Sequence, residues 1–387
     1  MQDQVAHSSD PSSLTWEILA RLPHAVIRRR GRFVVVELTV PHCTITTSTR
    51  NGGQTDHVRY LVNHQSCEGA GHDARFEIIT SQGAEAYHGT VCAEVGVPPD
   101  QAAVMGTAAN MNYAAIIRRC HAELEVTAIV TAGVESNATC AGDPALWHET
   151  QDGIVKLPGG TINTMLVINM PVTRSALAQT VTVMTEGKSA ALRRLAVPSR
   201  YSADLATGTG TDQYCVAAPI EGPKPLTTAS PHMKFGEIVG LAVRDATLEA
   251  LRWQNGLEFS YARSLLHALG RFGLSESTLL DGLANLLDAS DFELFKKNSK
   301  AVLYEPNVGA AAHALAAVLD RARHGILPQS CEREATVQQA AMLAANLAAK
   351  PHRWAKYRDL LQATQGSSNE LVIAAIALGW SEKWRPT

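Results

Sequence analysis

Aromatic residues are scarce in this chain, at 5%, and charged residues make up only 18%. With a formal net charge of −3, no excess of lysine and arginine marks a surface for nucleic acid. The seven cysteines are scattered without a Cys-x-x-Cys pair, which favours reduced thiols over a disulfide framework. The most apolar stretch near the C-terminus, residues 371–378, is far shorter than the roughly 20 residues of a membrane span. These absences exclude polybasic, disulfide-stapled and membrane-spanning classes of protein.

What remains is ordinary globular composition. The 387 residues are 45% hydrophobic and can bury one or two cores. Residues 1–13 carry no basic start followed by an apolar run, so we expect a flexible tail and no signal peptide. We therefore expect a soluble cytoplasmic protein.

The composition changes near residue 256, where Asn255-Gly256 ends a predicted helix. Before this point strands and helices alternate, which predicts an α/β domain over residues 14–256, a mixed β-sheet layered with helices. After it, Ala/Leu-rich stretches predict an all-helical C-terminal region, residues 257–387. The sequence does not indicate the role of this region, and a second copy of the chain, giving a homo-oligomer, is one candidate partner for its helix faces.

Three apolar segments predict buried strands: residues 102–107, 126–132 and 161–169. Asn110 is a good N-cap, so we predict a helix over residues 111–120 between the first two strands. So short a strand–helix–strand unit predicts a parallel crossover that places Thr107 and Thr131 at one sheet edge. Open α/β sheets bind ligands at such an edge.

A further helix, predicted from about Thr173, has an apolar stripe at helical spacing: Leu177, Val181, Met184, Leu192 and Leu195. Lys188 falls on the same face. Its ammonium either extends from the edge of the stripe into solvent or points into a site between helix and sheet.

Five polar segments occur in a fixed order along the chain: TAGVESNATCAGDPA, GGTINTMLVIN, TEGKSAAL, PSRYSADLATGTGTD and HMKFGEIVG. Together they resemble the successive signature segments of adenosylcobinamide amidohydrolases. The resemblance covers about residues 30–255 and leaves the C-terminal helices unexplained.

The resemblance implies hydrolysis of the amide that joins the aminopropanol arm to the corrin ring of adenosylcobinamide. The product, adenosylcobyric acid, can re-enter cobamide synthesis, so corrinoid salvage or cobamide remodelling is the implied role. A small-molecule corrinoid is then the substrate, no further cofactor is required, and neither nucleic acid nor membrane is an expected partner.

Amide hydrolysis requires an activated water or nucleophile, donors for the oxyanion, and an acid for the leaving amine. Matched to the family motifs, the expected catalytic residues are Asp212, Glu186, Lys188, His232 and Asp143. The expected substrate-binding residues are Asn110, Asn137, Thr161, Asn163, Thr207, Thr209, Thr211 and Lys234. Asp212 is the first choice as base, because the glycines of residues 207–212 free backbone N–H groups beside its carboxylate.

Each assignment has a structural alternative. Asp212 can cap its own turn, Asp143 can order the turn before Pro144, and Asn137 and Asn163 can be satisfied buried amides. A covalent route through the hydroxyl of a threonine ranks below activated water, because no base stands at a diagnostic spacing.

Two other functions compete with this interpretation. Zinc could bind a His/Cys-rich stretch within residues 42–73: His42, Cys43, His57, His64, Cys67, His72 and Asp73. The spacing matches no zinc signature, so we expect a metal-independent enzyme. A non-catalytic corrinoid-binding protein is the other alternative, although the Asp-x-His-x-x-Gly sequence typical of a cobalt-ligating histidine is absent.

Overall fold

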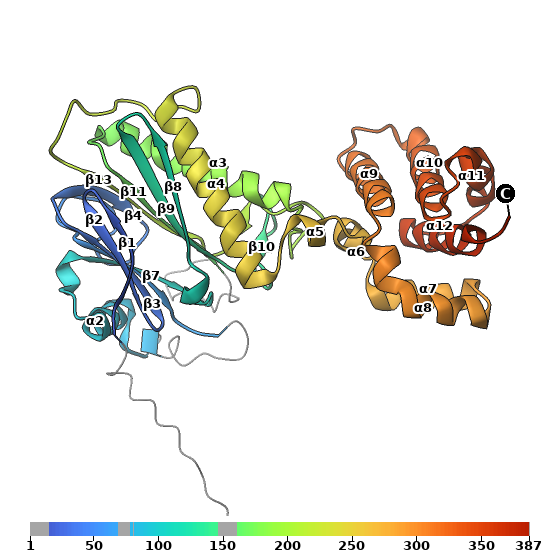
Figure 1. Cartoon of the computed structure of the whole chain (residues 1–387), viewed down its shortest axis with the longest axis horizontal. Coiled ribbons are helices and arrows are strands. Elements are labelled where there is room, and N and C mark those ends of the chain that lie inside the picture. The colour runs from blue at the N-terminus through green and yellow to red at the C-terminus, as the bar shows by residue number, and fades with distance from the viewer. Residues whose placement is uncertain (1–14, 69–77, 80, 146–160, 387) are drawn as a thin grey trace, which may run out of the picture. The chain divides into compact units, whose positions relative to one another are not determined.

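The computed structural model of the chain describes residues 15–68, 78–79, 81–145 and 161–386. The chain divides into two compact units. The first comprises Met1–Arg194 and Ala206–Gly256, and the second comprises Leu195–Leu205 and Leu257–Thr387. The predicted α/β architecture followed by a helical C-terminal region is confirmed (Figure 1).

Two stacked sheets, rather than one, form the centre of the first unit. The first sheet has the strand order β1-β2-β3-β6-β7: β1 (Glu17–Leu22), β2 (Ala25–Arg30), β3 (Phe33–Leu38), β6 (Tyr60–Gln65) and β7 (Ala102–Thr107). The second has the order β5-β4-β13-β11-β9-β8: β5 (Gly53–Thr55), β4 (His42–Thr46), β13 (Gln213–Pro219), β11 (Ile162–Ile168), β9 (Leu124–Ala132) and β8 (Ala115–His121). Both sheets are mixed, since only β6/β7 and β11/β13 pair in parallel.

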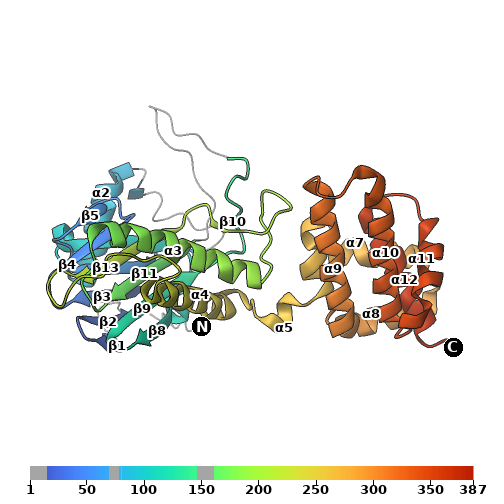
Figure 2. The same cartoon turned by 90° about the horizontal axis from the view of Figure 1, so that it is seen from above.

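Buried apolar side chains join the two sheets face to face. Val36 and Met105 of the first sheet share one core cluster with Ile129 and Met165 of the second. On the outer face of the first sheet, Val35 packs with residues of helix α2 (Ala84–Val95). Helix α4 (Lys234–Asn255) contacts β8 and β9 and packs against helix α3 (Arg174–Arg194), as Figure 2 shows. The layers are therefore helix, sheet, sheet and helices.

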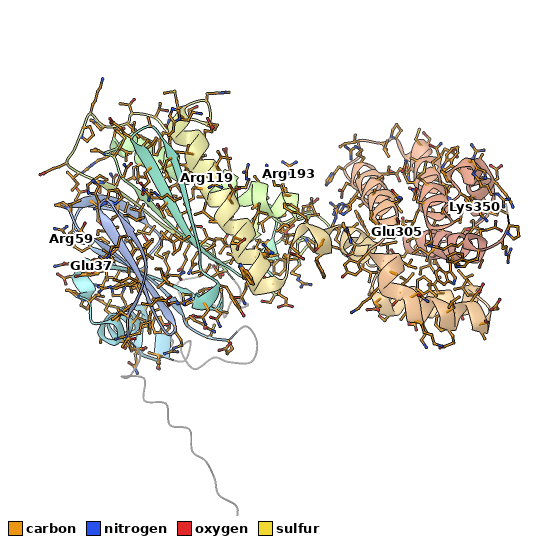
Figure 3. The ribbon with its side chains drawn as sticks, in the orientation of Figure 1. Glu37, Arg59, Arg119, Arg193, Glu305 and Lys350 are labelled. Carbon is orange, nitrogen blue, oxygen red and sulfur yellow. The ribbon has the colours of Figure 1, made fainter. Side chains whose placement is uncertain are left out.

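A pair of glycines lets α3 and α4 approach closely. A Cβ on Gly187 would lie 2.8 Å from the carbonyl oxygen of Gly240, so only glycine fits at this crossing. Arg119 of β8, labelled in Figure 3, donates a hydrogen bond to Asp245 of α4 at 2.6 Å. These contacts fix α3, and with it Lys188, over the second sheet.

The predicted helix over residues 111–120 is wrong. Asn110 does cap a short 3-10 turn, Met111–Tyr113, but the chain then forms strand β8, which pairs antiparallel with β9. The hairpin turns at Ala122, which has a positive φ of 49°. The branched side chains of Ile116 and Ile117 suit a strand, and periodicity alone does not separate a short buried helix from a strand.

The predicted parallel crossover is wrong for the same reason. Thr107 ends β7 in the first sheet, whereas Thr131 lies in β9 of the second. Both strand ends nevertheless meet across the sheets, because Asn163, the β11 partner of Thr131, donates a hydrogen bond to the carbonyl oxygen of Gly106 at 3.1 Å.

The second unit is helical, as predicted. Its helices are α5 (Phe259–Ala262), α6 (Leu265–Leu269), α7 (Glu276–Leu286), α8 (Ala289–Leu303), α9 (Pro306–Arg323), α10 (Gln329–Leu347), α11 (Trp354–Gln362) and α12 (Ser368–Lys383). Capping boxes begin α7 at Ser275 and α12 at Ser367, and each satisfies backbone N–H groups that a helix start leaves open. Residues 195–205 join this unit through Ala203, whose carbonyl oxygen accepts from Arg271 at 2.6 Å. In the part of the chain that the structure describes, every helix is too short or too polar to cross a membrane.

Candidate functional site

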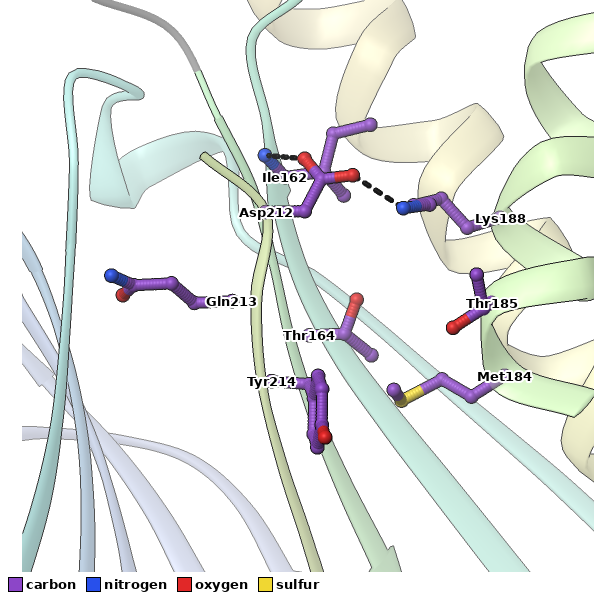
Figure 4. Close-up of a pocket in the computed structure, with 8 residues that line it drawn as sticks. All are labelled: Ile162, Thr164, Met184, Thr185, Lys188, Asp212, Gln213 and Tyr214. Atoms are coloured by element: carbon purple, nitrogen blue, oxygen red, sulfur yellow. Dashed lines mark hydrogen bonds and ion pairs between the residues drawn. The ribbon is translucent and has the colours of Figure 1, made fainter. Parts of the chain in front are cut away.

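A small pocket lies between helix α3 and the amino-terminal ends of β11 and β13. Its lining residues are Ile162, Thr164, Met184, Thr185, Lys188, Asp212, Gln213 and Tyr214 (Figure 4). The volume of about 30 Å³ is enough to hold at least one water molecule, so the pocket admits a water or a small polar group.

Lys188 and Asp212 form an ion pair in this pocket. The ammonium Nζ donates to Oδ2 of Asp212, and the side chains are 13% and 19% exposed, respectively. Figure 4 shows the two groups pointing toward each other, while the side chain of Gln213 points away from Lys188. The sequence left two positions open for the ammonium of Lys188, in solvent or in a site between helix and sheet. In the structure it lies between helix α3 and the second sheet.

The carboxylate of Asp212 accepts four hydrogen bonds. Oδ1 accepts from the backbone N–H of Ile162 at 3.0 Å and from the hydroxyl of Thr209 at 2.5 Å. Oδ2 accepts from the backbone N–H of Thr209 at 3.1 Å and from Lys188. A carboxylate has about four acceptor positions, so these contacts use its full capacity.

Two glycines let the loop approach the ion pair. A Cβ on Gly208 would lie 2.7 Å from Nζ of Lys188, and a Cβ on Gly210 would lie 3.1 Å from Oδ1 of Asn137. Larger residues at these positions would push the loop away from its neighbours. The two glycines of this loop are therefore required for its close packing.

Hydrogen bonds from neighbouring segments anchor the rest of the loop. Thr161 donates from its hydroxyl to the carbonyl oxygen of Thr211 at 2.5 Å, and Nδ2 of Asn137 donates to the hydroxyl of Thr211 at 3.3 Å. The hydroxyl of Thr207 accepts from the backbone N–H of Ala141 at 2.9 Å. The structure thus brings these four predicted substrate-binding residues, together with Thr209, to the same loop.

Asn163 lies on the opposite face of the second sheet, in a buried amide cluster. Its Nδ2 donates to Oδ1 of Asn63 at 2.8 Å, and Nδ2 of Asn63 donates to the hydroxyl of Thr131 at 2.8 Å. Gln213 accepts from the backbone N–H of Gly106 at 3.1 Å. Sequence reasoning missed Asn63, although a polar Asn-His pair inside the apolar strand YLVNHQ is a usable signal.

The other predicted site residues lie apart from the pocket lining. Glu186 is exposed on α3, and exposed His232 precedes α4. Lys234 is paired with Glu237 at 2.6 Å on the surface. Asp143 accepts from the backbone N–H of Cys140 at 2.7 Å, the turn-ordering role given as its alternative.

The residues proposed as zinc ligands do not form a cluster among the described residues, where no group of three or more His, Cys, Asp or Glu side chains could hold a metal ion. His42 is buried, with Nδ1 2.8 Å from the carbonyl oxygen of Val40, and burial lowers its pKa to about 4. His64 contacts the carbonyl oxygen of Met105 at 2.9 Å and the hydroxyl of Tyr87 at 2.5 Å. His72 and Asp73 lie outside the described residues.

The chain is similar in sequence to known proteins. An uncharacterized protein of Methanocaldococcus jannaschii is 31% identical over 183 residues, which are 44% of this chain and 71% of that protein. A crystal structure of the PH0078 protein from Pyrococcus horikoshii aligns with 62% of this chain and 83% of that chain, at 12% identity and a TM-score of 0.30. The profile of the family described as adenosylcobinamide amidohydrolase matches residues 20–259, which include the whole pocket. The chain therefore belongs to the adenosylcobinamide amidohydrolase family, as the resemblance of its motifs implied.

Proposed function

We propose that this chain hydrolyses the amide between the aminopropanol arm and the corrin ring of adenosylcobinamide. The products are adenosylcobyric acid and aminopropanol, and the acid returns to cobamide synthesis, which makes the reaction a salvage or remodelling step. Family membership supports the reaction class. The observation that carries the proposal is the Lys188–Asp212 pair, which lines a water-sized pocket beside a glycine-rich loop.

Lys188 supplies the charge that this reaction needs. Attack on an amide carbonyl places negative charge on its oxygen, and a preorganised donor in a partly dry site stabilises that oxyanion. An ammonium has three N–H donors, and Asp212 accepts one of them in the described structure. The ammonium can therefore contact the carbonyl oxygen of a bound amide and protonate the leaving amine.

Asp212 holds this ammonium in place. Because backbone N–H groups of Ile162 and Thr209 anchor the carboxylate, the ion pair has a fixed position relative to β11 and β13. Such anchoring provides the preorganisation that oxyanion stabilisation requires. Asp212 thus positions Lys188 as well as neutralising it.

The size of the pocket limits which part of the substrate can enter it. A pocket of about 30 Å³ is far too small for the corrin ring, so only a small group of the substrate can enter it. The ring then lies outside the pocket, and the arm reaches inward. Asn137 and Thr161 both donate hydrogen bonds to Thr211 of the loop. These three residues therefore position the loop, and their effect on the ring is indirect.

An assay of chelator-treated protein with adenosylcobinamide tests the proposal, with adenosylcobyric acid and aminopropanol followed by mass spectrometry. We expect both products in equal amounts without added metal. Binding of adenosylcobinamide without release of either product contradicts the proposal and favours a corrinoid carrier. Release that appears only after zinc is restored favours the zinc alternative.

A further inference from the structure

The four hydrogen bonds to Asp212 restrict how the amide can be attacked. For a water to give its proton to this carboxylate, it needs an acceptor position, and Ile162, Thr209 and Lys188 occupy those available. A water can therefore reach the carboxylate as a base only if one of these bonds breaks first. This arrangement disfavours water activation by Asp212, the route ranked first from sequence.

The hydroxyl of Thr209 has no such obstacle. Its proton is already directed at Oδ1 of Asp212, with Oγ1 2.5 Å from that oxygen. A short hydrogen bond to an ionised acceptor is the arrangement by which a neighbouring base activates a hydroxyl nucleophile. Asp212, the base predicted from the sequence, is thus in direct contact with the hydroxyl of Thr209, a contact that the sequence did not indicate.

We propose that Thr209 is the nucleophile of the reaction and forms a covalent ester with the corrinoid. This inference rests on the proposed function and assigns the attacking group at the same site. Oγ1 of Thr209 bonds to the amide carbonyl carbon as its proton passes to Asp212, and Lys188 stabilises the oxyanion. The C–N bond then breaks, the leaving nitrogen takes a proton from Lys188, and aminopropanol departs as the amine.

Water completes the cycle. It attacks the ester carbonyl carbon, and the bond between that carbon and Oγ1 breaks. One proton of the water returns to the threonine hydroxyl, and its oxygen becomes part of the adenosylcobyric acid carboxyl group. The carboxyl proton of Asp212 returns to Lys188, so the enzyme is restored and one water is consumed for each amide cleaved.

The loop places Thr209 next to the ion pair. The hydroxyl meets Asp212 directly, and the neighbouring Gly208 lies so close to Lys188 that a Cβ there would be 2.7 Å from Nζ. Thr209 is 7% exposed and does not itself line the pocket, but its hydroxyl contacts Asp212, which does. Thr209 of strand β12 (Gly208–Thr209) pairs with Ala138 of strand β10 (Ala138–Thr139), and this pairing fixes the backbone at this position.

Trapping of the ester tests the inference. The full chain is mixed with adenosylcobinamide and quenched in acid within one turnover, and intact-protein and peptide mass spectrometry locate any corrinoid adduct. A parallel reaction contains hydroxylamine, which converts an acyl ester into a corrinoid hydroxamate. We expect an adduct on the peptide that carries Thr209, and hydroxamate formation that depends on enzyme.

Variants of Thr209 test whether this residue is the nucleophile or only positions the loop. Thr209→Ala should lose about 10³-fold or more in kcat and form neither adduct nor hydroxamate. Thr209→Ser keeps the hydroxyl and should retain adduct formation. Thr182→Ala, an exposed threonine on α3, is the matched control and should behave as wild type.

Three results overturn the inference. One is near-wild-type turnover by Thr209→Ala. Another is hydrolysis by the wild type without adduct or hydroxamate, which leaves Thr209 a positioning residue even if Thr209→Ala is inactive or unfolded. The third is no hydrolysis of adenosylcobinamide by the wild type, which removes the proposed function itself.

Discussion

Lys188 on helix α3 and Asp212, directly before strand β13, meet as an ion pair, although 24 residues separate them in sequence. Both side chains are mostly shielded from solvent, so salt screens their attraction less than it screens a surface pair. The pair joins the helix layer to the second sheet at the pocket. The predictions for activity follow from this contact.

Replacement of Lys188 by methionine should remove the donor for the oxyanion while keeping the aliphatic stem. We expect kcat/KM for adenosylcobinamide to fall about 10²- to 10³-fold. The fold should persist, because Asp212 keeps three other donors. The control is Arg193→Met, which removes an exposed cation from the same helix. Equal activity of the two variants would show that Lys188 takes no part in the reaction.

Replacement of Asn163 by alanine should weaken the contact between the two sheets. Asn163 is fully buried, and its amide donates to both Asn63 and the carbonyl oxygen of Gly106. The buried Oδ1 of Asn63 and the part-buried carbonyl oxygen of Gly106 lose their donor, so the free energy of unfolding should fall by about 2 to 4 kcal/mol. Hydrogen exchange of β6 and β11 peptides in increasing urea reports this change for the first unit alone. Asn112→Ala, at an exposed position, is the control, and an equally small effect of both variants would contradict the prediction.

Buried His42 should make the first unit less stable in acid. Burial lowers its pKa from 6.5 to about 4, so the folded state holds His42 neutral while the unfolded chain binds a proton. Stability is therefore lost as the pH falls from about 6.5 to about 4, by roughly 3 kcal/mol in total.

The variant His42→Leu isolates this contribution. Its unfolding free energy should depend less on pH in that interval, and His88, whose pKa burial also lowers, accounts for part of the remaining dependence. Exposed His121→Leu serves as the control. An unchanged pH dependence in His42→Leu would show that this histidine is not held neutral in the fold.

Local patterns in the sequence predicted several individual elements. The apolar runs gave β7, β9 and β11, and the helix that ends at Asn255-Gly256 is observed as α4, with Gly256 in the left-handed conformation. The stacking of two sheets was not predictable in this way. Strand β4 pairs with β13, as in the contact of Thr46 with Cys215, and such long-range pairing depends on the shared core rather than on local preference.

The site could be predicted only as a set of motifs. The sequence indicated Lys188, Asp212 and the glycine-rich loop, but it contained no signal that Thr209 and Lys188 share one carboxylate, because that contact depends on how α3 packs. Glu186, two residues from Lys188, faces solvent, as helical spacing requires. No periodic pattern in the sequence predicts which way His232 faces. The structure shows that it is exposed before α4 and does not line the pocket.

The decisive measurement compares the rate of adenosylcobyric acid formation by the wild type and by Asp212→Asn, both treated with chelator. The amide that replaces the carboxylate cannot accept from all four donors, so it should release Lys188 and disturb Thr209 while the backbone fold remains. We predict a loss of about 10²- to 10⁴-fold in turnover, with the thermal unfolding transition retained. Wild-type turnover by Asp212→Asn would contradict the assignment of the Lys188–Asp212 pocket as the site of amide hydrolysis.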